Sequence, residues 1–512
     1  MKNLVKHRSI ILLLGLLVFV SQACDLSNPT PPPFRGGSPT AQAIAASATA
    51  HAATQNAVTL PLPNFYLTPS VVPPTATHPV PTLSNTGPWL VYPTDGGQAL
   101  VALNLDGTVA NRVTIPPLLD VADLLPGLSP KGGVMAFRTG RLSTPEEDAL
   151  YLLYLPDGKL QVLTPLFSEI EQLMIESQDQ RALDAVKGVI QPDSLSWSPD
   201  GRYLAFIAAL DRNSSDLYLY DTQEHKIIRL TFGLNMVSTS FWSPDGQWVF
   251  TQEVMAFNGN NGWTLGSVLR INVQTGETLK VYTPLPESTR EVFVGWANLT
   301  TLISYSLGPD GGESLRLFEL TFSKESFLYS GPFRELAFDP QTKTIAFIPG
   351  QSSSGTGFVV PGLYFLLPDN IEPQLVQTGN WQNLSWSVNG NEFLISGSQG
   401  AAGITPDGTA NLVPGEARLS PSPTGKWLAC WGGTMSGYKT GVRLYRSEGG
   451  VSQELINSPV QELVWQPDSN GVFFISGNHL DMATLPSLQV LTLDSEVKPG
   501  LLPYLIWVFS HG

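Results

Sequence analysis

The 512-residue chain has only two cysteines and six histidines. Cys430 lies in the apolar stretch WLACW and is expected to be a small buried residue, so we expect no structural disulfide. A chain of this length can bury a stable core without one. Three histidines fall within the first 80 residues, and His225, His479 and His511 are too far apart for a ligand cluster. The sequence predicts no metal site and no cofactor.

Motifs of common enzyme classes are also absent, and positive charge is scarce. The chain has neither a G-x-S-x-G nucleophile elbow nor a phosphate-binding loop, so no catalytic residue is predicted. The formal charge is −15, and leaving out Lys2, Lys6 and Arg8 makes it −18. No basic stripe is present to neutralise phosphates, which excludes nucleic acid as a partner. We interpret the spread acidity as a means of solubility, with attraction of cationic partners as the alternative.

The chain is instead rich in copies of one repeat, LSWSPDGRYLAFIA at residues 195–208. It returns closely as SFWSPDGQWVFTQ from Ser240. Looser copies begin at Gly127, Leu336, Leu384, Leu419 and Leu463, and a degenerate one begins at Val294. The spacing of about 35 to 50 residues is typical of propeller blades.

Each copy has the pattern of a β-hairpin. Leu195 and Trp197 alternate with serines, as in a strand with one buried face. Pro199 ends this strand and Gly201 supplies the positive φ of a tight turn. The strand that follows is apolar on both faces, which predicts a sheet stacked between two others. The recurring tryptophans are expected to lie between such sheets: Trp197, Trp242, Trp386 and Trp465.

With this turn and these strands, the repeats resemble the PD40 (TolB-like, WD40-like) β-propeller repeats over most of residues 88–509. The resemblance implies an all-β fold consisting of a single β-propeller. Nine candidate second strands predict about eight or nine four-stranded blades. The family includes binding proteins and peptidase-associated domains, in which catalytic residues lie outside the repeats. The resemblance therefore implies a fold and leaves the activity open.

The two ends of residues 87–512 are complementary. Gly87–Thr108 resembles the second and third strands of a blade, with no first strand before it. PYLIWVFS from Pro503 is an apolar strand left over after a complete repeat. We expect the C-terminal strand to complete the first blade, because closing the ring removes both exposed sheet edges.

The N-terminal region is typical of an exported protein. Residues 1–23 combine basic residues with a short apolar run, as in a signal peptide. Cys24 follows directly and is expected to be acylated. The lipid would then be the only contact with the membrane. The protein is expected at the outer face of the cell membrane. Ser21 and Ala23 also suit an ordinary signal peptidase, which leaves a secreted or periplasmic protein as the alternative. Residues 24–86 are rich in Pro, Thr and Ala and are interpreted as a disordered tether.

Residues 168–188 depart from the repeat and predict one broken helix or two short ones. Ser168 with Glu171 forms a capping box, Ser177 with Gln180 is a second candidate, and Gly188 can end the helix. An apolar stripe is predicted at Ile170, Leu173, Leu183 and Val186. We interpret the insertion as a patch on the propeller surface, with a partner-binding or lid element as the alternative.

Topology places the long glycine-rich loops on the face opposite the Ser-Pro-Asp-Gly turns, where binding is expected. The candidate binding residues there are Trp263, Phe358, Tyr438, Asn260 and Asn261. We therefore predict a non-catalytic module that binds an unidentified protein or an envelope glycan. The alternative is a hydrolase or lyase acting on peptides or envelope glycans through acidic residues near the propeller axis. A pair of perturbed carboxylates there would favour the enzyme.

Overall fold

The computed structural model describes residues 87–508 except 96, 141–147, 192, 212–213, 233–234, 258–262, 285–287, 289, 309–310, 351–359, 368–369, 388–389, 433–438, 447–451, 496 and 498–504. The described residues belong to one compact unit, Phe65–Gly512. The predicted signal peptide, Cys24 and the tether lie outside the described residues. No helix within the described part is both long enough and apolar enough to span a membrane.

Almost all regular secondary structure of the described residues is antiparallel β-strand. The first sheets contain β1 (Trp89–Thr94), β2 (Ala99–Leu103), β3 (Val109–Thr114) and β35 (Ile506–Val508); β4 (Val134–Thr139), β5 (Ala149–Tyr154) and β6 (Lys159–Pro165); β7 (Leu195–Trp197), β8 (Tyr203–Asp211), β9 (Ser214–Asp221) and β10 (Lys226–Arg229); and β11 (Met236–Val237), β12 (Phe241–Trp242), β13 (Trp248–Phe257), β14 (Trp263–Asn272) and β15 (Thr278–Tyr282).

The remaining sheets follow the same order along the chain. They contain β16 (Arg290–Trp296), β17 (Thr301–Gly308), β18 (Gly311–Glu319), β19 (Lys324–Phe338), β20 (Ile345–Pro349), β21 (Gly362–Leu367) and β22 (Asn370–Thr378); β23 (Trp381–Trp386), β24 (Phe393–Gly397), β25 (Gly400–Ile404) and β26 (Ala410–Val413); β27 (Arg418–Pro421), β28 (Trp427–Gly432), β29 (Gly441–Arg446) and β30 (Gln453–Ile456); and β31 (Glu462–Trp465), β32 (Gly471–Ser476), β33 (His479–Thr484) and β34 (Gln489–Asp494).

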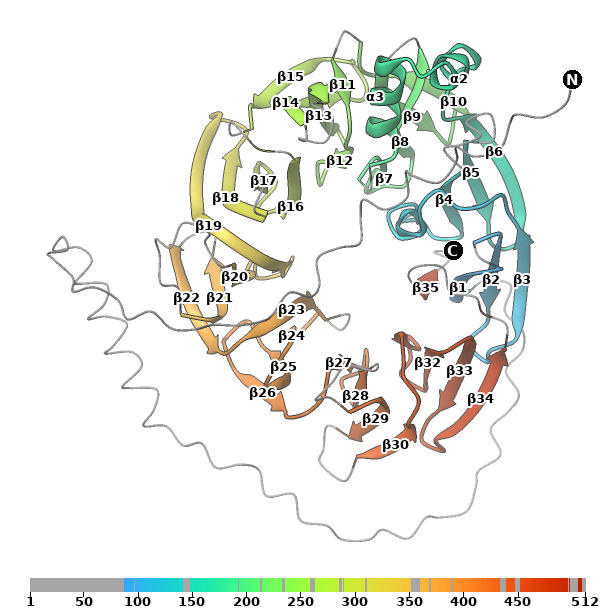
Figure 1. Cartoon of the computed structure of the whole chain (residues 1–512), viewed down its shortest axis with the longest axis vertical. Coiled ribbons are helices and arrows are strands. Elements are labelled where there is room, and N and C mark those ends of the chain that lie inside the picture. The colour runs from blue at the N-terminus through green and yellow to red at the C-terminus, as the bar shows by residue number, and fades with distance from the viewer. Residues whose placement is uncertain are drawn as a thin grey trace, which may run out of the picture. The chain divides into compact units, whose positions relative to one another are not determined.

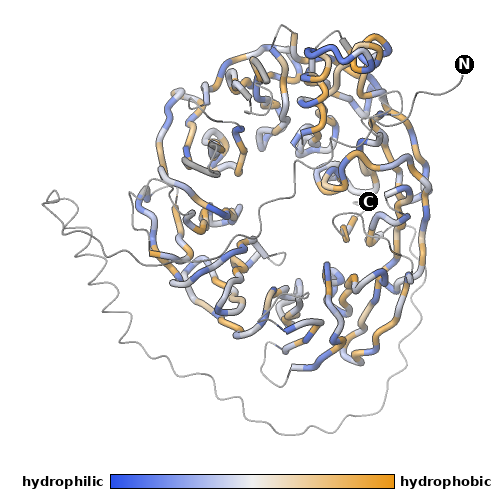
Figure 2. The backbone as a smooth tube through the Cα atoms, in the orientation of Figure 1, coloured by the Kyte–Doolittle hydropathy of each residue, from blue (hydrophilic) through white to orange (hydrophobic). Residues whose placement is uncertain are grey.

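The sheets follow one another around a common axis, with the first strand of each repeat innermost (Figure 1). Hydrophobic residues run through the strands of every sheet instead of gathering in one central core (Figure 2). Buried apolar side chains of consecutive sheets form shared clusters, such as the one joining β1 and β2 to β4 and β5. This is the all-β propeller architecture that the sequence predicts, because each sheet buries its two faces against two neighbours.

The ring is closed by the C-terminal strand, as predicted. β35 pairs antiparallel with β1 through Trp89 and Val508, Leu90 and Trp507, and Val91 and Ile506. The degenerate copy at Val294 also forms a hairpin, β16 with β17. The 15-residue strand β19 joins the strands of two repeats into one seven-stranded sheet. The number of blades stays a prediction for this reason.

The Ser-Pro-Asp-Gly turn is held by its own side chains. The Ser198 hydroxyl donates to Asp200 Oδ1 at 2.6 Å and accepts from the Tyr203 amide at 2.9 Å. Gly201 takes the positive φ of 63° that the sequence predicts. The turn therefore fixes where the second strand of the repeat begins.

Tryptophans from several innermost strands tie their sheets to the preceding ones. Trp197 Nε1 donates to the Gly127 carbonyl at 2.7 Å, and Trp465 Nε1 donates to the Ser420 carbonyl at 2.8 Å. Equivalent bonds join Trp242 to Ser196, Trp296 to Trp242 and Trp507 to Trp465. The prediction that these indoles lie between sheets is confirmed for Trp197, Trp242 and Trp465. We call this place in the repeat the inter-sheet tryptophan position.

The insertion forms two short helices, α2 (Glu169–Glu176) and α3 (Gln180–Val189). The Ser168 hydroxyl caps α2 by accepting from the Glu171 amide at 3.2 Å, as predicted. The second predicted cap is wrong, because the carboxylate of Asp179, and not Ser177, accepts from the first turn of α3. Gly188 lies inside α3, where an added Cβ would meet Ser215 Oγ at 2.2 Å, so it allows close packing instead of ending the helix.

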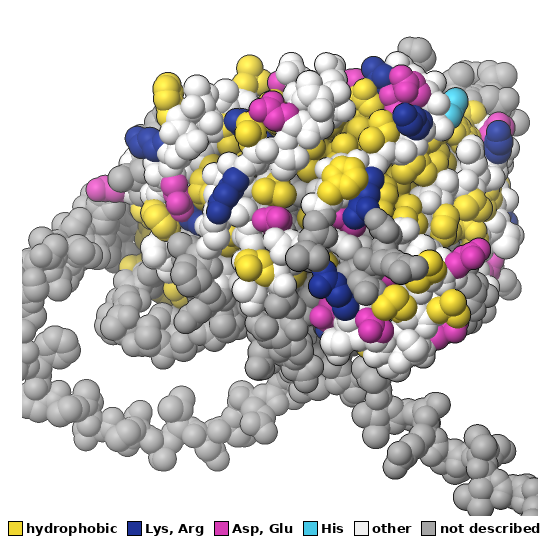
Figure 3. All heavy atoms as spheres, turned by 90° about the horizontal axis from the view of Figure 1, so that it is seen from above, with side chains coloured by type: hydrophobic (Ala, Val, Ile, Leu, Met, Phe, Trp, Pro, Cys, Tyr) yellow, Lys and Arg dark blue, Asp and Glu magenta, His cyan; other side chains and the backbone are white. Residues whose placement is uncertain are grey.

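The predicted apolar stripe of the insertion is half wrong. Leu183 and Val186 pack against the core, but Ile170 and Leu173 are 44% and 63% exposed. α2 is only eight residues long and buries the face that carries Ile175 instead. The rim that carries β11, α3 and α2 consequently exposes hydrophobic side chains among charged ones (Figure 3).

Candidate binding cleft

The residues predicted to form a binding face fall mostly outside the described residues. Asn260, Asn261, Phe358 and Tyr438 are not among them. Trp263 begins β14, but only its backbone is described. Their grouping on one face stays a prediction.

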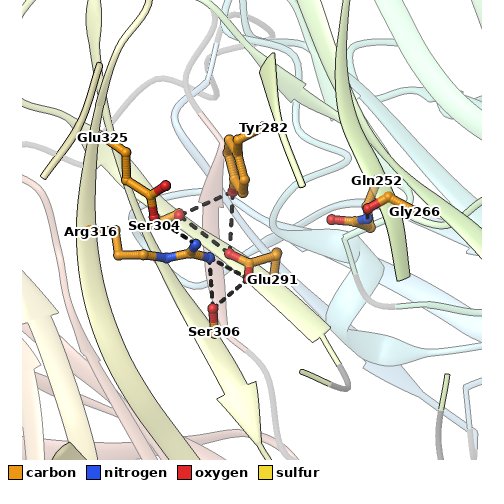
Figure 4. A network of polar contacts seen from close by, with 8 residues as sticks. All are labelled: Gln252, Gly266, Tyr282, Glu291, Ser304, Ser306, Arg316 and Glu325. Atoms are coloured by element: carbon orange, nitrogen blue, oxygen red, sulfur yellow. Dashed lines mark hydrogen bonds and ion pairs between the residues drawn. The ribbon is translucent and has the colours of Figure 1, made fainter. Parts of the chain in front are cut away.

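A cluster of buried ionisable groups lies between β15 and the sheet that follows it (Figure 4). Glu291 accepts from Arg316 Nη2 at 2.6 Å and from the Ser306 hydroxyl at 2.5 Å, and the Tyr282 hydroxyl donates to it at 3.2 Å. Burial raises the pKa of Glu291, although Arg316 opposes the shift. Both side chains of the ion pair are fully buried, which closes them to a substrate and makes the pair structural.

The same pair recurs in the sheet β27–β30. Arg443 donates to Glu416 from Nε at 2.9 Å and from Nη2 at 2.5 Å. Glu291 and Glu416 each lie three residues before the apolar residue that opens a repeat, and each arginine lies on the third strand. Of two unrelated pairs, Arg138 with Asp123 is fully buried, and in Arg229 with Asp216 only the carboxylate is buried. Structural ion pairs therefore account for these buried charges.

A cleft of about 250 Å³ lies between the innermost strands of two neighbouring sheets, β23–β26 and β27–β30. Its walls combine polar and apolar side chains from the first two strands of each sheet. They are Asn383, Leu384, Ser385, Leu394, Ile395, Ser396, Arg418, Leu419 and Trp431. No acidic residue is among them, although acidic residues outnumber basic ones in the chain by 43 to 28.

The sheet β27–β30, which forms one wall of the cleft, lacks the tryptophan of the repeat. Pro421 pairs with Leu428 in the register in which Trp465 pairs with Val472 and Trp242 with Val249. Pro421 thus occupies the inter-sheet tryptophan position of its repeat. Proline has no indole to reach the preceding sheet. Pro421 does not itself line the cleft, but Arg418 and Leu419 of the same strand do.

One cation and several neutral polar groups define the chemistry of the cleft. The Arg418 guanidinium lies over the Trp431 ring, 4.7 Å from its centroid. Asn383 Nδ2 donates to Ser396 Oγ at 2.9 Å, and Asn383 and Ser385 are exposed. The buried Trp431 Nε1 has no hydrogen-bond partner within the described part of the chain. Each of these groups can donate a hydrogen bond, so the cleft suits an acceptor-rich ligand.

The charge of this arginine also affects the pKa of Glu462, which lies on the next innermost strand, β31. Burial raises the pKa of Glu462 to about 7, and the charge of Arg418 opposes the shift. Glu462 is therefore partly protonated near neutral pH. It does not line the cleft.

A second group of ionisable residues, Asp193, Arg290, Tyr305 and Glu335, comes from the segment before β7 and from β16, β17 and β19. Arg290 forms an ion pair with Asp193, which joins the segments before β7 and at the start of β16. Burial raises the pKa of Tyr305, with Asp193 and Glu335 adding to the rise and Arg290 opposing it. Burial also raises the pKa of Glu335. Two carboxylates, a tyrosine and an arginine thus influence one another here. No set of three metal-ligating side chains occurs among the described residues.

The class of protein that the fold defines is a β-propeller, here with a cleft between two of its sheets. No family model matches the sequence. The "uncharacterized peptidase YuxL" of Bacillus subtilis is 43% identical over 51 residues, which are 10% of this chain and 8% of that protein. The chain therefore spans under a tenth of this curated relative.

Similar solved structures have low sequence identity. A eukaryotic initiation factor is 12% identical, with a TM-score of 0.48 over 73% of this chain and 87% of that chain. TolB from Acinetobacter baumannii is 12% identical, with a TM-score of 0.27 over 71% and 77%. Membership of the PD40 family accordingly stays a resemblance, and ligand and activity have to be argued from the cleft.

Sequence reasoning missed the cleft, although its signal was present. The copy LSPSPTGKWLACW from Leu419 carries proline where the clear copies carry tryptophan. A missing large side chain between two stacked sheets predicts a space at that interface.

Proposed function

We propose that the protein is a non-catalytic binding module whose ligand enters the cleft between β23–β26 and β27–β30. The observation that carries the proposal is the absence of the inter-sheet tryptophan at Pro421, in the same strand that supplies Arg418 to a cleft also lined by Asn383 and Ser385. An interface that served stability alone would be filled, as it is at Trp465.

We further propose that the propeller is held outside the cell by an acylated Cys24 and a tether of residues 24–86. The small residues before Cys24 and the proline-rich composition after it support this arrangement. Cys24→Ser should move the protein from the membrane fraction to the medium or periplasm. Continued retention in the membrane would contradict lipid anchoring.

The binding proposal is tested by retention of envelope components on the purified whole chain in detergent. Arg418→Gln removes the cation of the cleft. Arg446→Gln is the matched control, because Arg446 also lies over a tryptophan of the same sheet, 5.1 Å from the Trp427 ring centroid, but does not line the cleft. A component retained by the wild type and the control, and lost from Arg418→Gln, supports the proposal. Equal retention by all three proteins would contradict it.

The second candidate function is a hydrolase or lyase acting on peptides or envelope glycans. It is supported by the group of Asp193, Arg290, Tyr305 and Glu335, in which two carboxylates act on one tyrosine. Such groups of perturbed residues occur at catalytic sites. Turnover of envelope peptides or glycans that is lost in both Glu335→Gln and Tyr305→Phe would favour the enzyme over the binding module.

A further inference from the structure

We infer that the ligand of the cleft presents a peptide carboxylate, either a chain end or an acidic side chain, to Arg418. This inference rests on the proposed binding function and names its ligand. The binding function itself does not require the ligand to be a peptide.

Charge selects an anion at this cleft. Among the described residues, Arg418 is the only charged one that lines it, and the chain carries an excess of acidic groups. A cationic ligand would meet the guanidinium and would find no carboxylate on the cleft walls. An anionic ligand is attracted by the positive charge of Arg418. The acidic surface elsewhere repels it, so the anion binds selectively at the cleft.

The shape of the donor set favours a planar carboxylate. The Arg418 guanidinium lies over the Trp431 ring. A guanidinium has a planar fork of N–H donors that matches a carboxylate in a two-point contact. Ser385 and Asn383 offer a hydroxyl and an amide on the opposite wall. These groups can bind the oxygen atoms of a carboxylate or the peptide group beside it.

Two observations favour a peptide over an acidic sugar. The guanidinium already covers one face of Trp431, and a sugar would use an open aromatic face for stacking. β23 is the terminal strand of its sheet, so its outer edge pairs with no other strand of that sheet. An extended peptide can pair with such an edge while its carboxylate reaches Arg418.

The size of the cleft limits what it can hold. Its 250 Å³ lies below the range of roughly 300–1,000 Å³ typical of pockets for drug-sized ligands. The cleft therefore suits one chain end or one side chain. The remainder of a longer peptide would extend along the strand edge.

The test uses defined probes and the whole chain in detergent micelles, with affinities measured by titration calorimetry. The probes are N-acetyl-Ala-Ala-Ala with a free C-terminus, the same peptide as its C-terminal amide, N-acetyl-Ala-Asp-Ala-amide, and glucuronate. We expect at least one carboxylate peptide to bind about tenfold or more tightly than the neutral amide, as a charge-assisted contact gives. The free C-terminus and the aspartate probe separate the two sources of the carboxylate.

Variants assign the effect to Arg418. Arg418→Gln should abolish the preference for the carboxylate peptide, and Arg446→Gln should keep it. Equal affinity for acid and amide, an unchanged preference in Arg418→Gln, or tighter binding of glucuronate than of either carboxylate peptide would overturn the inference. If envelope components are retained through Arg418 while no carboxylate peptide binds, the binding function stands and the peptide inference fails. If neither is seen, both fail.

Discussion

The sheet β27–β30 meets its two neighbours in opposite ways. Towards β31–β34 the interface is filled: Trp465 is buried, donates to the Ser420 carbonyl at 2.8 Å and packs with Trp431 and Phe474. Towards β23–β26 the equivalent position is Pro421, and a cleft of about 250 Å³ remains. The two interfaces of this sheet thus differ at one equivalent position of the repeat, tryptophan at one and proline at the other.

Packing at the interface with β31–β34 also positions a residue of the cleft at the interface with β23–β26. Trp431 lines the cleft and at the same time belongs to the apolar cluster around Trp465. Its ring carries the Arg418 guanidinium. The position of the cation in the cleft therefore depends on packing in the neighbouring interface, which rigid sheets can maintain.

The largest effect is expected on the filled side. Trp465→Ala should lower the free energy of unfolding by about 3–5 kcal/mol, because it removes a buried indole and leaves a cavity between two sheets. Urea denaturation measures this, and Trp197→Ala should behave alike at its own interface. A loss below about 1 kcal/mol at both positions would contradict the stabilising role of the inter-sheet tryptophan.

A smaller, opposite effect is expected on the open side. Pro421→Trp should restore the missing side chain and raise the free energy of unfolding by about 0.5–2 kcal/mol, as other cavity-filling changes do. The same denaturation experiment measures it. A loss of more than about 1 kcal/mol would show that this interface cannot accommodate the indole.

A pH-dependent effect is expected at Glu462, which does not line the cleft. Its pKa rises from an ordinary value of 4.5 to about 7 on burial, so across this interval the folded chain holds a proton that the unfolded chain has lost. The stability contributed by this group is therefore lost as pH rises from about 4.5 to 7. Glu462→Gln should stabilise the protein more at pH 8 than at pH 5. An equal difference at the two pH values would contradict the burial of this carboxyl group.

The sequence was sufficient to predict the ring of sheets. It was insufficient to predict most of the polar contacts within it. The unmatched strands at Gly87–Thr108 and Pro503 predicted the closure that β1 and β35 make. Local rules also predicted the cap at Ser168, but they failed where tertiary packing decides, since Ile170 and Leu173 of α2 face solvent. Arg316 and Glu291 lie 25 residues apart on different strands, and no local pattern links them. Only the structure shows that Arg443 and Glu416 repeat the pair.

The most direct test of the account is ligand retention by Pro421→Trp, with Ser385→Leu as a second variant that fills the cleft from the opposite wall. Thermal unfolding of each variant verifies that the ring is folded. The account predicts that both variants remain folded and lose the ligand that wild type and Arg446→Gln retain. Undiminished retention by a folded Pro421→Trp variant would contradict the claim that the cleft left by the missing tryptophan is the binding site.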